Sequence, residues 1–149
     1  MIKQRGFTLV ELLVVFAIGA LIIGIAPVAL QSLRESTEYR DALRLLISDM
    51  RQARWRATSE GREMRFSVDL KQRIYGIEGG SQHPLAQALT LRATVADQEL
   101  QANSVASIRF LPSGGASGGS FDLLRASGTG VRVRVDWLTG RVEQEPLVP

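Results

Sequence analysis

The feature that most constrains this chain is an apolar run of 24 residues, Phe7 to Leu30, which contains a single charged side chain, Glu11. As an α-helix the run would extend about 36 Å, at about 1.5 Å per residue, and the hydrocarbon core of a bilayer is about 30 Å thick. The run therefore predicts a membrane-spanning helix. A carboxylate inside such a helix costs about 2.5–3.5 kcal/mol on insertion scales, so Glu11 needs a partner or a function. The alternative is that Glu11 only reaches toward the nearby interface.

The residues before the run predict its orientation. Residues 1–6 read MIKQRG and carry Lys3 and Arg5 but no acidic residue. By the positive-inside rule this end lies in the cytoplasm, so the chain beyond Leu30 lies across the membrane. A secretory signal peptide would have a shorter apolar region followed by a small-residue cleavage site, and this chain has neither.

The basic leader followed by Gly6, Phe7 and Glu11 resembles the class III signal of type IV pilins and type II secretion pseudopilins. The resemblance implies that a membrane prepilin peptidase cuts between Gly6 and Phe7, on the cytoplasmic side, and methylates the new amine of Phe7. That amine would be a cation in a low-dielectric helix bundle, where Glu11 of a neighbouring subunit is the natural counter-charge. Glu11 is therefore predicted to be an assembly residue.

The composition fits one exported domain behind this anchor. The predicted organisation is a cleaved leader at 1–6, a transmembrane helix at 7–30 and a periplasmic domain at 31–149. About 119 residues remain for the domain, enough for one small core. The chain has no cysteine, so packing alone must hold that core. Loss of the leader would leave 16 basic and 15 acidic residues, so the mature chain is nearly neutral.

The periodicity of the domain predicts an α+β fold. Residues 31–59 lack glycine and proline and repeat apolar residues at three- and four-residue steps, which indicates an amphipathic helix that continues the membrane helix. Pro27 is expected to bend this helix, and Gly61 to end it. The region 62–145 alternates apolar and polar residues in short segments and predicts antiparallel strands packed against the helix. The expected strands are 64–68, 73–77, 89–95, 105–111, 120–124, 131–135 and 141–145, with turns at 69–72 and 136–140.

Two segments are predicted to be mobile loops because they are rich in Gly, Ser and Pro: Gly79 to Gln87 and Pro112 to Gly119. The second loop, FLPSGGASGG when Phe110 and Leu111 are included, and the later VRVRVDWLTGRV at Val131 to Val142 resemble the carboxyl-terminal half of the H-type minor pseudopilin of type II secretion and its type IV pilus relatives. The resemblance implies a pilin-like fold, with an amino-terminal helix packed against two antiparallel sheets.

No enzymatic, metal or cofactor site is predicted. His83, the only histidine, lies beside Pro84 and is expected to be an exposed turn residue, and no residue that could serve as a base accompanies the serines near the glycines. The major pseudopilin usually has an acidic calcium-binding loop, but here Asp136, Glu143 and Glu145 are too scattered to form one. No catalytic residue, metal ligand or cofactor is therefore proposed.

A second candidate function is binding to nucleic acid or lipid. Arginines gather around Trp55, and Arg51, Arg54, Arg132 and Arg134 are the candidate contacts. Acidic residues are interspersed along the same helical region, so nucleic-acid binding is the less favoured reading. Trp55 itself is expected to cover the sheet.

The sequence thus predicts a minor pseudopilin, a structural and assembly subunit near the tip of the periplasmic pseudopilus of a type II protein secretion system. The alternative is a minor pilin of a type IV pilus, with or without a role in DNA binding and uptake. The implied location is the bacterial inner membrane, crossed once, with incorporation into the pseudopilus. The implied partners are the other major and minor pseudopilins, prepilin peptidase and the inner-membrane assembly platform, with secreted substrates as a further candidate.

Overall fold

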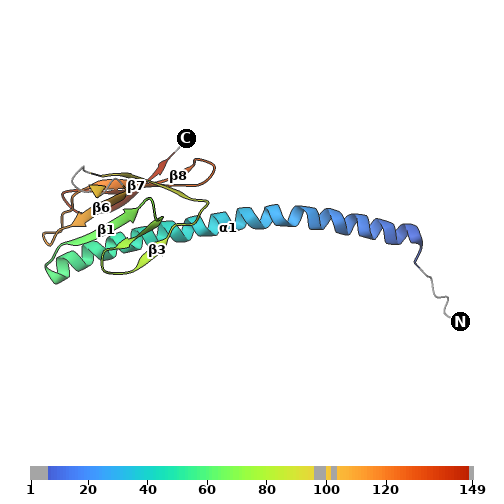
Figure 1. Cartoon of the computed structure of the whole chain (residues 1–149), viewed down its shortest axis with the longest axis horizontal. Helices are drawn as coiled ribbons and strands as arrows, with labels where there is room; N and C mark the ends of the chain where they lie inside the picture. The colour runs from blue at the N-terminus through green and yellow to red at the C-terminus, as the bar shows by residue number, and fades with distance from the viewer. Residues whose placement is uncertain (1–6, 96–99, 102–103, 148–149) are drawn as a thin grey trace. The chain divides into compact units, whose positions relative to one another are not determined.

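The computed structural model describes residues 7–95, 100–101 and 104–147, apart from the side chains of residues 22–33 and 100–101. The chain divides into two compact units, Met1–Thr37 and Glu38–Pro149. The described elements are one helix and a series of strands (Figure 1). They are α1 (Leu9–Glu60), β1 (Met64–Asp69), β2 (Ile74–Ile77), β3 (Gln82–Pro84), β4 (Thr90–Thr94), β5 (Leu100–Gln101), β6 (Val105–Phe110), β7 (Gly119–Leu124), β8 (Gly130–Val135) and β9 (Val142–Leu147).

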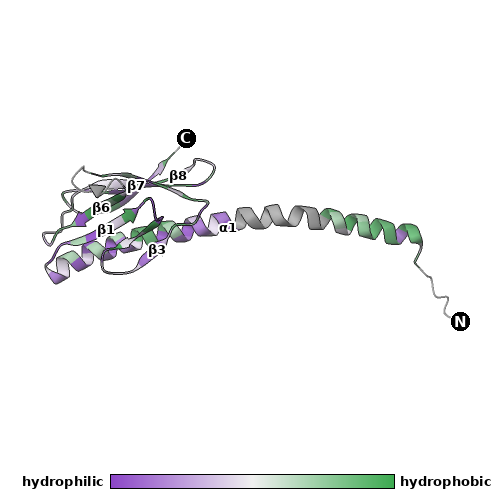
Figure 2. Ribbon diagram, in the orientation of Figure 1, coloured by the Kyte–Doolittle hydropathy of each residue, from purple (hydrophilic) through white to green (hydrophobic). Residues whose placement is uncertain are grey.

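Helix α1 runs through position 27 without a break, so Pro27 does not end it. It ends at Glu60, and Gly61 follows with φ +66°, the left-handed conformation that a glycine C-cap adopts. The predicted stop is therefore confirmed. Along the described part of α1, apolar residues dominate the first turns and polar residues the last (Figure 2).

Among the described residues, no helix combines the length and apolar character that crossing a membrane requires. The predicted span Phe7 to Leu30 includes residues 22–30, whose side chains lie outside the described part of the chain. The span stays a prediction.

The strands form two antiparallel sheets, as predicted. Sheet A has the order β3-β2-β1-β6-β5, and sheet B has the order β4-β7-β8-β9. In sheet A, β1 lies between β2 and β6, with Phe66 opposite Ile77 on one side and Ile108 on the other. Two strands were not predicted: β5 and β3. The second of these, Gln82–Pro84, pairs with β2 inside the segment expected to be a loop.

One core joins the helix and both sheets. The buried side of α1 repeats at three- and four-residue spacing, and both sheets contribute alternate residues to the same cluster. The helical members are Tyr39, Ala42, Leu46, Ile47, Met50, Ala53 and Ala57. Phe66 of sheet A meets Phe121 of sheet B edge to face, with ring centroids 5.7 Å apart and planes at 66°. This aromatic pair is a direct link between the two sheets.

The segment Pro112 to Gly119 is anchored rather than free. Its backbone bonds to two other parts of the domain: Ala116 N donates to the carbonyl oxygen of Trp137 at 2.9 Å, and Ser117 N donates to that of Arg109 at 2.8 Å. The Ala116 side chain is buried. The expectation of a mobile loop was wrong for these residues, because composition does not reveal backbone partners supplied by distant strands.

Both predicted aspartate turns are confirmed. Asp69 Oδ1 accepts hydrogen bonds from the backbone N–H groups of Lys71 and Gln72, each at 2.8 Å. Asp136 Oδ1 accepts from both the N–H and the hydroxyl of Thr139, each at 2.8 Å, and these bonds hold the pKa of Asp136 below its ordinary value. The second turn brings β8 and β9 together and places Arg141 directly before β9.

Candidate functional site

The described part of the amino-terminal motif is a reciprocal cap on α1. The N–H of Thr8 donates to Glu11 Oε2 at 3.4 Å, and the N–H of Glu11 donates to Thr8 Oγ1 at 3.3 Å. This arrangement is a capping box, in which the N-cap residue and the residue three positions later satisfy each other's free N–H groups. The carboxylate of Glu11 in the first turn also complements the positive end of the helix dipole.

The capping role of Glu11 was missed, although the Thr-x-x-Glu spacing was visible in the sequence. Both hydrogen bonds are long, and both side chains are exposed, so the carboxylate stays accessible to a second chain. Phe7 is 79% exposed. Gly6 and the rest of the leader lie outside the described residues, and cleavage between Gly6 and Phe7 stays a prediction.

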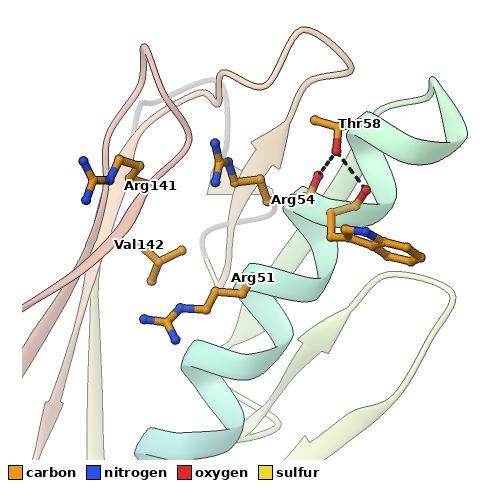
Figure 3. A pocket seen from close by; sticks show the side chains of 6 residues that line it. Arg51, Arg54, Thr58, Arg141 and Val142 are labelled. Atoms are coloured by element: carbon orange, nitrogen blue, oxygen red, sulfur yellow. Dashed lines mark hydrogen bonds between the residues drawn. The ribbon is translucent and has the colours of Figure 1, made fainter.

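A basic cavity of about 500 Å³ lies between α1 and β9. Its lining comprises Arg51, Arg54, Trp55, Thr58, Arg141 and Val142. Figure 3 shows Arg51 and Arg54 extending from α1 toward Arg141 and Val142, and Val142 is the first residue of β9. Arg51 and Arg54 were among the contacts predicted from the sequence, but Arg141 was missed, because only the folded β8–β9 hairpin brings it to the same cavity.

Trp55 does not cover the sheet, because its side chain is 66% exposed. The helix turns Met50, Ala53 and Ala57 into the core, and at 100° per residue Trp55 falls on a different face. The prediction for Trp55 was therefore wrong.

The other two candidate arginines are paired on sheet B. Arg132 binds Asp122 with both arms of its guanidinium, through Nε to Oδ1 at 2.7 Å and Nη2 to Oδ2 at 2.8 Å. These hydrogen bonds raise the pKa of Arg132. Arg134 forms two ion pairs: its Nη2 lies 3.4 Å from Oε2 of Glu143, and its Nε lies 3.3 Å from Oε1 of Glu145. The structure does not place Arg132 or Arg134 in the cavity that Arg51 and Arg54 line.

His83 is not an exposed turn residue. It lies on β3, and its Nε2 is 3.2 Å from Oδ2 of Asp49 on α1, with the two side chains 25% and 9% exposed. Burial raises the pKa of Asp49, while the charges of His83 and Arg56 oppose that rise. Burial together with the charge of Asp49 raises the pKa of Tyr75 to about 12. The contact between His83 and Asp49 connects β3 to the helix.

Two family descriptions match the chain. Residues 1–27 match the prokaryotic N-terminal methylation motif, and residues 42–140 match type II transport protein GspH. The chain belongs to the type II transport protein GspH family. The match to the methylation motif contains Gly6, Phe7 and Glu11, and the match to the GspH family contains the residues of the basic cavity apart from Arg141 and Val142.

A curated relative and a solved structure agree with the family. The chain is 34% identical over 145 residues to type II secretion system protein H of Xanthomonas campestris pv. campestris. The aligned region covers 97% of this chain and 85% of that protein. Its fold is similar to that of the minor pseudopilin EpsH from the type 2 secretion system of Vibrio cholerae, with a TM-score of 0.57 and 13% identity over 73% of this chain and 97% of EpsH. The predicted H-type minor pseudopilin is thereby confirmed, and type II secretion is favoured over the type IV pilus alternative.

Proposed function

We propose that this chain is an architectural subunit that is processed by prepilin peptidase, anchored in the inner membrane and assembled near the tip of the periplasmic pseudopilus. The observation that carries the proposal is the presence of both family matches on one chain: the methylation motif over residues 1–27 and the GspH match over residues 42–140. Its partners are then the other pseudopilins and the assembly platform, with secreted proteins as the cargo of the system.

The apolar surface at the start of α1 supports membrane anchoring. Large apolar side chains from Phe7 to Leu21 are 48–82% exposed. A contiguous surface of this kind is unfavourable in water, so it needs lipid or the helices of other subunits around it. The bilayer would cover it before assembly, and neighbouring pseudopilin helices would cover it afterwards.

Glu11 supports the assembly step. Its carboxylate makes one long hydrogen bond, to the N–H of Thr8, and stays exposed. Cleavage before Phe7 would create a cationic amine on each subunit, and an ion pair between that amine and Glu11 of a neighbour would be strong in an apolar surrounding. In this account Glu11 caps its own helix and pairs with another chain.

A pair of matched variants separates these two roles. Glu11→Gln removes the charge but retains the capping box, which accepts glutamine at this position. Thr8→Val removes the capping hydroxyl and keeps the charge. We expect Glu11→Gln to lose crosslinks to other pseudopilins and to block secretion, and Thr8→Val to retain both.

The measurement is in-cell crosslinking with a secretion assay and membrane fractionation. Both variants should remain in the membrane, since Glu11→Gln eases insertion by removing the charge and Thr8→Val makes the helix start more apolar. If Glu11→Gln assembles and secretes like the wild type, the charge has no assembly role and Glu11 serves only the helix cap.

A further inference from the structure

The basic cavity continues into a second hollow along α1. The second hollow, also about 500 Å³, shares Arg51 and is lined by further helix residues and by Gln144 of β9. Those helix residues include Arg40, Arg44, Leu43 and Ile47. We call the two together the arginine groove. It lies within the unit Glu38–Pro149, between α1 and β9, which is an edge strand of sheet B.

The charge in the arginine groove is not compensated by the groove itself. None of the residues that line the two hollows is acidic. Within the described part of the chain, Arg51, Arg54 and Arg141 form no ion pair. By contrast, Arg132 and Arg134 on the same domain are each held by carboxylates. Arg44, in the second hollow, lies 3.9 Å from an exposed carboxylate oxygen of Asp41, so the charge without a partner among the described residues is concentrated at Arg51, Arg54 and Arg141.

Arg54 is positioned rather than freely solvated. A Cβ built on Gly140 would lie 3.1 Å from Arg54 Nε and 3.3 Å from its Cδ, so the hairpin turn packs against this side chain. Its Nε is buried and has no hydrogen-bond partner among the described residues. A buried N–H without a partner is unfavourable, and an acceptor entering the groove would relieve it.

We propose that the arginine groove binds the carboxylates of an extended acidic segment of another pseudopilin. The proposal rests on the function proposed above. Guanidinium groups match carboxylates with two parallel hydrogen bonds, and three such groups face one cavity. The apolar side chains of Leu43, Ile47 and Val142 line the same groove and would pack against the apolar residues between the carboxylates.

The surroundings of the groove favour a peptide over a nucleic acid. Asp41 and Glu60 on α1 and the exposed Glu143 on β9 border the groove in sequence and carry negative charge. A nucleic-acid backbone presents a continuous row of phosphates and requires an extended basic track. A short groove with a few arginines fits a few carboxylates on one segment instead.

Photo-crosslinking in cells tests the proposal on the full chain. Trp55 lines the groove and is exposed, so replacing it with p-benzoylphenylalanine places a crosslinker at the site. In cells that express the complete set of pseudopilins, we expect a crosslink that maps by mass spectrometry to an acidic segment of another pseudopilin. The double variant Arg51→Glu with Arg141→Glu should lower its yield about tenfold or more, because it places like charges opposite each other.

The matched control is Arg92→Glu. Arg92 is an exposed arginine on β4, the opposite edge strand of sheet B, and the substitution makes the same charge change outside the groove. Its crosslink yield should equal that of the wild type. Arg54→Lys provides a second test without charge reversal: it keeps the cation and loses the planar fork, so the yield should fall while circular dichroism stays unchanged.

The proposal is overturned by an unchanged crosslink in the Arg51/Arg141 variant, or by a crosslink that maps to phospholipid, nucleic acid or a segment without carboxylates. If only the groove proposal is wrong, the crosslinks that depend on Glu11 should persist, while the crosslink from position 55 is unchanged in the Arg51/Arg141 variant or maps to a molecule other than an acidic segment. Absence of every pseudopilin crosslink in the wild type would instead contradict the proposed function.

Discussion

The contact between Phe66 and Phe121 gives a direct test of the core that unites the two sheets. Both side chains are fully buried, and their rings meet edge to face across the sheets. Truncating a buried phenylalanine to alanine costs about 3–5 kcal/mol. An aromatic pair in this geometry contributes about 0.5–1.5 kcal/mol beyond the buried area. We therefore expect Phe121→Ala to lose about 3–5 kcal/mol of unfolding free energy, and the pair to be coupled by about 0.5–1.5 kcal/mol.

The coupling can be measured with a double-mutant cycle of Phe66→Leu and Phe121→Leu, which keeps apolar volume at both positions. A fragment that begins at Gln31 is suitable, because the residues of the core cluster begin at Tyr39. Urea unfolding followed by circular dichroism gives the four free energies. Leu70→Ala serves as the control partner for Phe66→Leu, since Leu70 is partly exposed after β1, and this pair should be additive within about 0.5 kcal/mol. Coupling indistinguishable from the control would refute a shared core between the sheets.

Three further predictions follow from the described geometry and the motif. Coexpression with prepilin peptidase should shorten the chain by the six residues MIKQRG and leave a methylated amine on Phe7; an intact mass that places the cut beyond the apolar run would contradict this. Burial raises the pKa of Asp49 above 3.8, so the stability that Asp49 contributes is full below that pH and is lost as the pH rises through the pKa of the folded state; Asp49→Asn should therefore gain stability relative to the wild type as the pH is raised above 3.8, and urea titrations in which the variant's stability relative to the wild type stays constant or falls over that rise would contradict this. Gly140 has φ +64°, and a Cβ there would lie 2.5 Å from the carbonyl oxygen of Gly114, so Gly140→Ala should cost about 1–3 kcal/mol of unfolding free energy, whereas an unchanged urea midpoint would show that the turn relaxes freely.

The sequence predicted those parts of the fold that have a local pattern. The alternation of Met64, Phe66 and Val68 identified β1 and its buried face, and Gly61 marked the end of α1. Asp136 to Gly140 identified the hairpin turn in the same way. In each case the residues that form the element carry the periodicity or the backbone preference that creates it.

The features that were missed depend on contacts between distant segments. β3 is a short polar strand ending in Pro84, and it exists as an edge strand because β2 pairs with it and Asp49 of α1 meets His83. Arg141 joins Arg51 only after the β8–β9 hairpin has folded against the helix. The exposure of Trp55 was within reach of the sequence, since the spacing of the buried helix residues excludes it from the core face.

A role in type II secretion is tested most directly by deleting the gene that encodes this chain in its host. The secreted proteome and twitching motility of the deletion strain are then compared with those of the complemented strain. We expect deletion to reduce the proteins secreted by the type II system, the wild-type chain to restore them, and twitching to be unaffected. Normal secretion together with lost twitching would contradict this role and would assign the chain to a type IV pilus.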